Sequence, residues 1–418
     1  MKNKDKGENE YRDLSATAGE VSPTEITWSW GAASWVRTMA WPMLAVLMIG
    51  VFSCLRAEAA PRKEKVVVGY IMARGRVLNP SAIAAGKLTR INYAFARIRD
   101  GVIVEGGAHD AENFAVLTSL KKEYPALQVV VSVGGGGAGS GPFSDMAFTR
   151  ESRAKFIESC IAFIEKYNLD GVDIDWEYPG VPGSHNNKFR AEDKQTYTLL
   201  LKELRLRLNR EQKKLHRHLV TSTATGWTTS WLEHTDMREA SKWVDTVNLM
   251  CYDYYEPRDP NTGHDAPLFT NPADPKGVST DRSVKENLAA GVPPNKLVVG
   301  VPFYGKQWED VPPQNHGLFE PGKAAANPTP LYGTIASKMI GHGFTRYWDP
   351  IAQAPYLYNE ATRTFVTYDD PEALAKKAAY VMKHHLAGIM FWEYTGDPNN
   401  VLLDAINTGL HRKVTAAK

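Results

Sequence analysis

Three carboxylates stand at alternate positions in segment 170–177, which reads DGVDIDWE: Asp173, Asp175 and Glu177. On a β-strand, successive side chains point to opposite faces, so these acids would share one face and the apolar residues between them would pack on the other. Neighbouring carboxylates cannot all ionise easily, so the pKa of at least one is raised. A carboxylic acid that stays protonated near neutral pH can act as a general acid. A purely structural strand has no reason to align three acids, and the spacing therefore predicts acid–base chemistry.

A strand-then-helix rhythm runs through residues 60–410. Strand patterns occupy 66–71, 90–96, 128–133, 170–177, 219–225, 244–252, 297–303 and 388–393. Helical patterns occupy 111–123, 148–167, 192–214, 283–290 and 371–386. Strands that alternate with helices indicate a parallel sheet, and eight such units in about 350 residues fit an α/β fold of the (β/α)8 TIM barrel type. A doubly wound open sheet is the alternative, which the even spacing of the units disfavours.

One interval is too long for a turn and a helix. Residues 305–368, between the seventh and eighth strands, hold Pro-rich turns, a short helical pattern at 333–341 and strand-like pieces at 345–348 and 364–368. We predict a small α+β insertion that walls a deep cleft. The loop 254–280 is rich in Pro, Asp and Asn and is expected to border the same cleft.

Active sites of such barrels lie at the C-terminal ends of the strands. In this chain those ends combine acids with aromatic residues, a mixture that suits a sugar chain, because pyranose CH faces stack on rings while hydroxyl groups bind carboxylates. The alternative is that some rings, Phe95 and Phe303 among them, belong to the barrel core. We expect the substrate to contact Tyr70, Phe95, Gly134, Gly135, Tyr178, Met250, Asp253 and Trp392.

Other chemistries fit the sequence poorly. Gly134, Gly136 and Gly139 match G-x-G-x-x-G, but Ser140-Gly141-Pro142 interrupts the helix that a dinucleotide site needs. The three acids could bind Mg²⁺ or Mn²⁺, yet their aromatic surroundings favour a sugar, and no Cys/His cluster has zinc-site spacing. No metal or cofactor is therefore expected. A formal net charge of +2 without a Lys/Arg run argues against a nucleic-acid partner.

The first 59 residues differ from the rest of the chain. An apolar run over residues 39–55 precedes Ala57-Glu58-Ala59, an A-x-A-type cleavage site, and predicts a secretory signal peptide or a membrane anchor. We divide the chain into this N-terminal segment, 1–59, and a barrel domain, 60–418. A secreted or cell-envelope monomer is expected. Of the 3 cysteines, Cys160 and Cys251 lie in the barrel, where they are either paired or free.

Several segments together resemble glycoside hydrolase family 18, the chitinases and their relatives. Residues 170–177 match the DGxDxDxE signature, residues 132–135 resemble the SxGG strand, and residues 250–253 match the MxYD motif. Residues 263–268 and 301–305 are similar to further chitinase segments, and Trp392 matches the tryptophan beneath the sugar at the cleavage point. The resemblance covers about residues 64–411 and implies a TIM barrel that hydrolyses chitin.

The resemblance also implies a retaining mechanism without a carboxylate nucleophile. Glu177 would protonate the glycosidic oxygen and later act as the base for water. The 2-acetamido oxygen of the substrate would attack the anomeric carbon, and Asp175 would stabilise the resulting oxazolinium ion. Asp173 would share a proton with Asp175, and Tyr252 would hold the acetamido oxygen.

Two positions depart from the family pattern: Gly136 stands where Trp is frequent, and Lys306 where Arg is common. An endo-β-N-acetylglucosaminidase acting on glycans or peptidoglycan is an alternative within the same enzyme class. A non-catalytic chitin-binding lectin of the same fold is a second alternative, disfavoured because Glu177, Asp175 and Tyr252 are all present. The expected partners are chitin or N-acetylglucosamine oligosaccharides.

Overall fold

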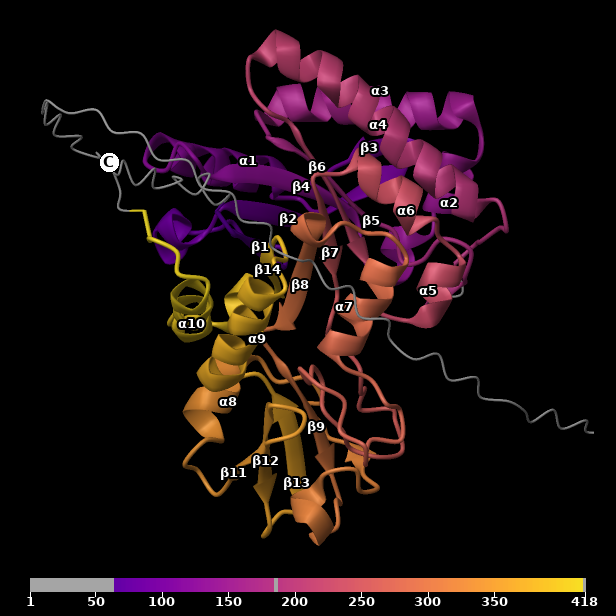
Figure 1. The fold of residues 1–418 in the computed structure, drawn as a ribbon. Coiled ribbons are helices and arrows are strands. Elements are labelled where there is room, and N and C mark those ends of the chain that lie inside the picture. The colour runs from indigo at the N-terminus through magenta and orange to yellow at the C-terminus, as the bar shows by residue number, and fades with distance from the viewer. Residues whose placement is uncertain (1–63, 184–186, 416–418) are drawn as a thin grey trace, which may run out of the picture. The chain divides into compact units, whose positions relative to one another are not determined.

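Eight parallel strands close into a barrel (Figure 1). The structure is a computed structural model that describes residues 64–183 and 187–415. The barrel closes because β1 pairs with both β2 and β14. In sequence order the barrel strands are β1 (Val66–Met72), β2 (Arg90–Arg99), β4 (Gln128–Gly134), β5 (Gly171–Asp175), β6 (Val220–Thr225), β7 (Thr246–Leu249), β8 (Leu297–Pro302) and β14 (Gly388–Trp392). The short strand β3 (Val102–Val104) adds antiparallel to β2. The predicted TIM barrel is thus confirmed.

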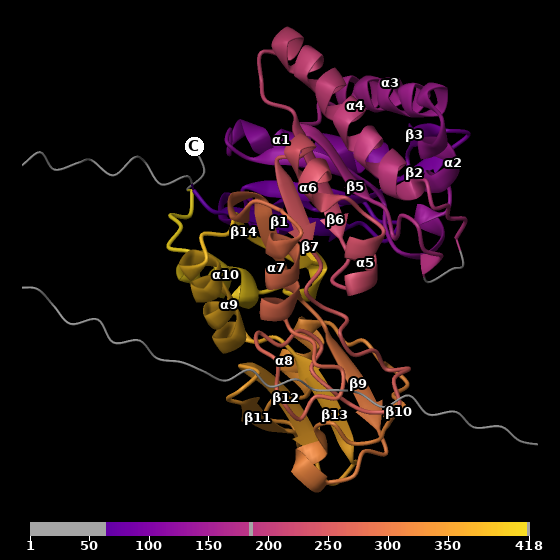
Figure 2. The same cartoon turned by 45° about the vertical axis from the view of Figure 1, so that its right-hand side comes forward.

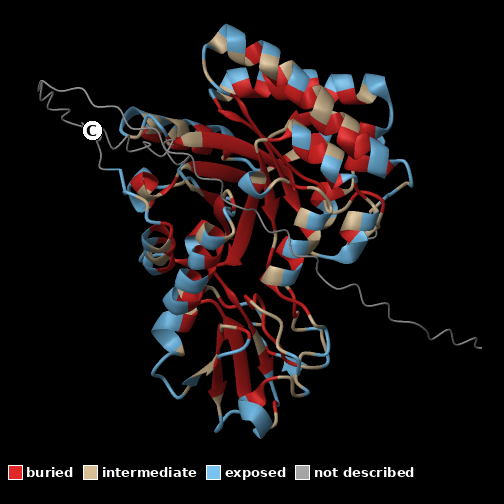
Figure 3. Cartoon of the chain, in the orientation of Figure 1, coloured by how far each residue is buried: buried red, intermediate tan, exposed pale blue. Residues whose placement is uncertain are grey.

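Helices cover the outside of the barrel, so the strands are buried on both faces (Figure 3). This explains why β1 and β4 are valine-rich runs rather than alternating patterns. The helices are α1 (Asp110–Ser119), α2 (Phe143–Phe148), α3 (Arg150–Tyr167), α4 (Asp193–Leu215), α5 (Thr229–Glu233), α6 (Met237–Ala240), α7 (Thr280–Ala289), α9 (Pro371–Lys383) and α10 (Val401–Gly409).

Helix boundaries follow local capping chemistry. The helix predicted over 148–167 is α3, which begins at Arg150 because the extended residue Thr149 ends the preceding α2 and caps α3, where its side chain and Ser152 form a capping box. Helix α7 begins at Thr280, earlier than predicted, because Ser279 supplies its N-cap. Helix α9 starts with Asp370 as N-cap and Pro371 in its first turn, both favourable there.

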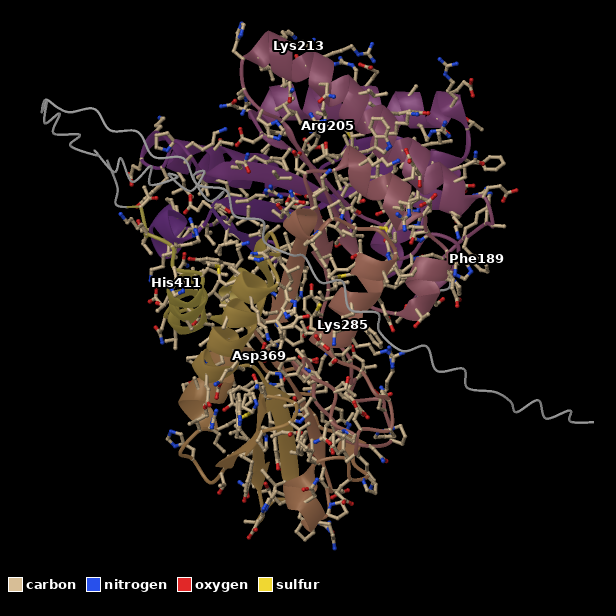
Figure 4. All side chains as sticks on the ribbon, viewed as in Figure 1. Phe189, Arg205, Lys213, Lys285, Asp369 and His411 are labelled. Carbon is tan, nitrogen blue, oxygen red and sulfur yellow. The ribbon has the colours of Figure 1, made fainter. Side chains whose placement is uncertain are left out.

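The insertion forms its own antiparallel sheet between β8 and β14 (Figures 1 and 2). Its elements are β9 (Gly305–Glu309), β10 (Lys323–Ala324), α8 (Tyr332–Lys338), β11 (Thr345–Asp349), β12 (Ala354–Asn359) and β13 (Thr364–Tyr368). Asp369, between β13 and α9 (Figure 4), accepts a hydrogen bond from Lys377 of α9, and both side chains are buried. The insertion is therefore anchored to the helix that leads back into the barrel.

The N-terminal apolar run at 39–55 lies outside the described residues, so the division at residue 59 and the leader or anchor stay predictions. Within the part of the chain that is described, no helix is long and apolar enough to cross a membrane. Cys160 and Cys251 are both buried as free thiols.

Candidate active site

A pocket of 230 Å³ opens at the C-terminal ends of the barrel strands. All the predicted site residues line it except Asp173, Gly134 and Gly135. The lining consists of Tyr70, Phe95, Gly136, Asp175, Glu177, Tyr178, Ala224, Trp227, Met250, Tyr252, Asp253 and Trp392.

The strand that carries the acids ends earlier than predicted. β5 stops at Asp175, so Glu177 belongs to the turn that follows and not to the strand. Its backbone N–H donates to the Ser140 hydroxyl at 2.7 Å instead of to a neighbouring strand, because the chain leaves the sheet at this point. The apolar partners behave as predicted, and Trp176 is buried and stacks on Phe143.

Asp173 lies beneath the pocket and is fully buried. Its Oδ2 accepts hydrogen bonds from Tyr70 Oη at 2.9 Å and from Ser132 Oγ at 2.7 Å. Its Oδ1 accepts from Ser222 Oγ at 2.6 Å and, more weakly, from Asn248 Nδ2 at 3.4 Å. Burial raises the pKa of Asp173, and the first three of these hydrogen bonds oppose that rise. The barrel interior thus holds one carboxyl group in a fixed orientation below the reacting groups.

Asp175 and Glu177 both have raised pKa values, and each influences the pKa of the other. The pKa of Asp175 is raised well above its usual value, first by burial and then by the charges of Glu177 and Asp173. Burial raises the pKa of Glu177 to about 7, with a contribution from the charge of Asp253, while hydrogen bonds with Tyr178 and Asp175 oppose the rise. A carboxyl group with a pKa near neutrality is suited to general acid–base catalysis. The predicted rise in pKa is therefore found at both acids that line the pocket, as well as at Asp173 beneath it.

Three aromatic side chains form one wall of the pocket. Trp392 stacks on Phe95, with ring centroids 5.5 Å apart and an interplanar angle of 21°. Tyr70 lies tilted against Trp392 at 6.0 Å. Phe95 and Trp392 are partly exposed, so their rings are available to a ligand, and Phe95 is not simply core. Phe303, by contrast, is buried against Phe391 outside the pocket lining.

Tyr252 and Asp253 face the pocket from the segment after β7. The Tyr252 hydroxyl lies 4.0 Å from Met390 Sδ, a weak acceptor, and so can still bind a ligand. Asp253 Oδ1 accepts a hydrogen bond from Tyr304 Oη at 2.7 Å and lies 2.7 Å from Lys306 Nζ. Its backbone N–H donates to Asp265 Oδ1 at 3.0 Å. Asp253 is therefore held from three sides.

Gly134 and Gly135 lie behind the pocket wall. Their φ angles are +109° and +81°, which favour glycine. A Cβ atom on Gly135 would approach the Phe95 ring to 2.5 Å, so its absence lets the chain pass beneath that ring. Contact between these two glycines and substrate stays a prediction.

Sequence reasoning missed Trp227, Ala224 and Gly136 as lining residues. The signal for Trp227 was present, because it follows the strand predicted over 219–225, whose C-terminal end faces the site. Within residues 64–183 and 187–415, no cluster of three or more His, Cys, Asp or Glu side chains is arranged to hold a metal ion.

Comparisons with known proteins agree with this geometry. The model of the glycosyl hydrolases family 18 matches residues 66–397. The chain therefore belongs to family 18 of the glycosyl hydrolases, as its motifs predicted.

Individual relatives and solved structures are similar to this chain over most of its length. Chitinase A1 of Niallia circulans is 32% identical over 88% of this chain, but the match covers only 62% of that protein. A family 18 N-acetylglucosaminidase from Paenibacillus barengoltzii is 37% identical, with a TM-score of 0.75 over 83% of this chain and 100% of its own. Chitinase ChiA74 from Bacillus thuringiensis is 30% identical, with a TM-score of 0.80 over 85% of this chain and 71% of its own.

Proposed function

We propose that this chain is a chitinase, which hydrolyses the β-1,4 linkages between N-acetylglucosamine units. The observation that carries the proposal is the pairing of Glu177, whose pKa is raised to about 7, with Asp175 in a pocket walled by Phe95 and Trp392. Hydrolysis of a neutral sugar chain requires an acid whose pKa is near neutrality and aromatic rings on which the sugar can stack. The names of Chitinase A1 and ChiA74 support the same substrate.

In the proposed reaction the substrate supplies the nucleophile. Glu177 gives its proton to the glycosidic oxygen as the bond from that oxygen to the anomeric carbon breaks. The 2-acetamido oxygen bonds to the anomeric carbon and forms a cyclic oxazolinium ion. Water then attacks the anomeric carbon, Glu177 takes a proton from it, and the ring opens to give a product with retained configuration.

The other carboxyl groups stabilise the charges that form during this reaction. Asp175 accepts the acetamido N–H and stabilises the positive charge of the oxazolinium ion. Asp173, buried below Asp175, disfavours a second full negative charge there, consistent with the raised pKa of Asp175. Tyr252 orients the acetamido oxygen, and Trp392 forms the floor beneath the reacting sugar.

A second candidate is an N-acetylglucosaminidase that releases units from short oligosaccharides, glycans or peptidoglycan. It is favoured by the 37% identity to the Paenibacillus barengoltzii N-acetylglucosaminidase, which is similar along its whole length. Both candidates use the same acid and the same acetamido chemistry, and they differ in where along a chain they cut.

Export of the protein to the cell envelope or beyond is also part of the proposal. It is supported by the apolar run at 39–55 and the A-x-A pattern after it. Polymeric chitin is too large to enter a cell, so an enzyme that acts on it must be placed outside.

The proposal is tested by comparing N-acetylglucosamine oligomers with glucose oligomers of equal length, while NMR follows the anomer that forms first. We expect cleavage of the acetamido sugars only, with the β-anomer as the first product. Equal rates on both sugars, or an α-anomer as first product, would exclude substrate assistance. The product sizes distinguish the two candidates.

A further inference from the structure

A hollow of 240 Å³ lies at the end of the barrel opposite the active site. The first residues of five barrel strands line it: Val66, Arg90, Gln128, Val220 and Thr246. The active-site pocket is at the C-terminal ends of the strands, so neither the motifs nor the roles proposed above involve this second cavity. We call it the floor hollow.

Arg90 is a buried cation in the wall of the floor hollow, and it has no acidic partner. It is only 3% exposed, and its Nη1 donates to Thr246 Oγ1 at 2.9 Å while its Nε donates to Gln128 Oε1 at 3.4 Å. Both acceptors are neutral. Among the described residues, Arg90 forms no ion pair, and its third nitrogen, Nη2, donates no hydrogen bond. A guanidinium group stays protonated in proteins, and burying such a charge without a countercharge is costly.

The acids nearest in electrostatic effect are bound to other groups. Burial lowers the pKa of Arg90, and the charges of Asp245 and Asp173 offset this only in part. Asp245 pairs with Arg205 at 3.2 Å and with His218 at 3.0 Å. Both oxygens of Asp173 accept hydrogen bonds from the hydroxyl groups described above. The protein therefore leaves the charge of Arg90 without a direct partner.

We propose that the floor hollow binds a small oxyanion, a phosphate or a carboxylate, with Arg90 as its main ligand. The proposal goes beyond the hydrolytic function and does not depend on it. Oxyanions accept charge-assisted hydrogen bonds from guanidinium groups, which are among the strongest in proteins. Such an ion would supply the countercharge that Arg90 lacks.

The rest of the lining suits an anion of this size. Its two acids are already balanced, because Asp245 has the partners named above and Glu64 pairs with Arg412 at 3.0 Å. The hydroxyl hydrogen of Thr246 has no acceptor among the described residues, so it is available to a ligand beside Arg90. The volume of 240 Å³ lies below the range of about 300–1,000 Å³ that is usual for sites of larger organic ligands.

The test measures anion binding directly. Inorganic phosphate and acetate are titrated separately into the full chain by isothermal titration calorimetry, near neutral pH and at constant ionic strength. Arg90→Met removes the buried cation. Asn295→Glu places a carboxylate in the lining of the floor hollow, at an exposed position that tolerates the change.

Arg210→Met is the matched control, because Arg210 is an exposed residue of α4 outside the floor hollow. All three substitutions lower the net charge by one. A general effect of charge on anion binding would therefore be the same in each variant, whereas an effect of the site would appear only in Arg90→Met and Asn295→Glu.

We expect saturable binding of at least one anion by the wild type and by Arg210→Met. Affinity should fall at least about tenfold in Arg90→Met and in Asn295→Glu, as the loss or blocking of a charge-assisted hydrogen bond predicts. Tighter binding of phosphate than of acetate would identify a phosphate as the occupant, and the reverse order would identify a carboxylate.

The absence of saturable binding of either anion up to tens of millimolar in the wild type would overturn the proposal. Equal affinity in the wild type and all three variants would overturn it as well. If Arg90→Met does not fold, Asn295→Glu decides, because its change lies at the surface. None of these measurements uses turnover, so their outcome is separate from that of the proposed hydrolysis.

Discussion

Lys306 Nζ lies 2.7 Å from Asp253 Oδ1, so the insertion between β8 and β14 supplies the countercharge for a carboxylate of the active-site pocket. Lys306 is only 5% exposed and also reaches Glu256 at 3.1 Å. Tyr304, two residues earlier, donates to the same oxygen of Asp253. The insertion thus reaches the active site, because Lys306 of its first strand pairs with a residue that lines the pocket.

Replacing Lys306 should therefore impair binding. Lys306→Met leaves Asp253 with Tyr304 as its remaining side-chain partner, and hydrogen bonds between charged groups contribute about 1.5–3 kcal/mol. We expect kcat/KM on N-acetylglucosamine oligomers to fall at least about tenfold, mainly through KM. Lys306→Arg keeps the charge and should recover most of the activity. Steady-state kinetics of both variants provide the measurement, and an unchanged KM in Lys306→Met would argue against this role.

The activity should decrease as the pH rises through neutrality. Glu177 must be protonated to act as an acid, and its pKa is raised to about 7 by burial and by the charge of Asp253. The kcat/KM should therefore be lost as pH rises through about 7. Asp253→Asn removes one negative charge, so the pKa of Glu177 should fall and the alkaline limb should move to lower pH. A pH profile tests this sign whatever the loss in overall rate, and a limb that stays or moves upward would refute it.

The hydrogen bond from Tyr70 to Asp173 offers a test of the buried carboxyl group. Tyr70→Phe keeps the ring beside Trp392 but removes the donor at 2.9 Å from Asp173 and the acceptor of Asn248 Nδ2. The free energy of unfolding should fall by about 1–3 kcal/mol, because buried polar groups lose their partners. Turnover should fall as well, since Asp173 loses one of the hydrogen bonds that orient it. Denaturant unfolding and kcat are the measurements, and a variant equal to the wild type in both would contradict the account.

Gly171 explains the glycine within the DGxDxDxE signature. Its φ is +150°, and an added Cβ would overlap the carbonyl oxygen of Val220 on the adjacent strand β6. Gly171→Ala should destabilise the fold by about 3 kcal/mol or more, within the range for a strained, overpacked site. The matched control is Gly75→Ala, where φ is +73° but no atom lies within 4 Å of the added Cβ. It should cost about 1–2 kcal/mol. Similar losses for both variants in thermal unfolding would show that crowding at Gly171 is unimportant.

Much of the fold could be predicted because most barrel strands are local runs rich in apolar or β-branched residues, such as β1, β4 and β8. Strands β9 and β12 of the insertion were not predicted, because they owe their structure to antiparallel partners along the sheet rather than to local pattern. The end of β5 at Asp175 was also missed. The pattern of alternating acids continues through Glu177, and only the contact from its N–H to Ser140 reveals that the chain has turned.

The candidate site was predictable where chemistry depends on residue type. The acids, Tyr252 and Trp392 were found from composition at strand ends and from motifs. Trp227 was missed. Its position after the strand predicted over 219–225 placed it near the site, but the orientation of its ring depends on packing against Tyr254. The cis peptide bonds at Ala94–Phe95, Glu177–Tyr178 and Trp392–Glu393 likewise have no signal in residue type.

The central claim is that Glu177 is the acid, and Glu177→Gln tests it most directly. Glutamine keeps the shape but cannot supply the proton, so turnover of N-acetylglucosamine oligomers should fall by about 10²–10⁴, while hexamer binding measured by calorimetry stays close to that of the wild type. Glu360→Gln, on an exposed turn of the insertion, should match the wild type in both measurements. Turnover by Glu177→Gln within about twofold of the wild type would contradict the account.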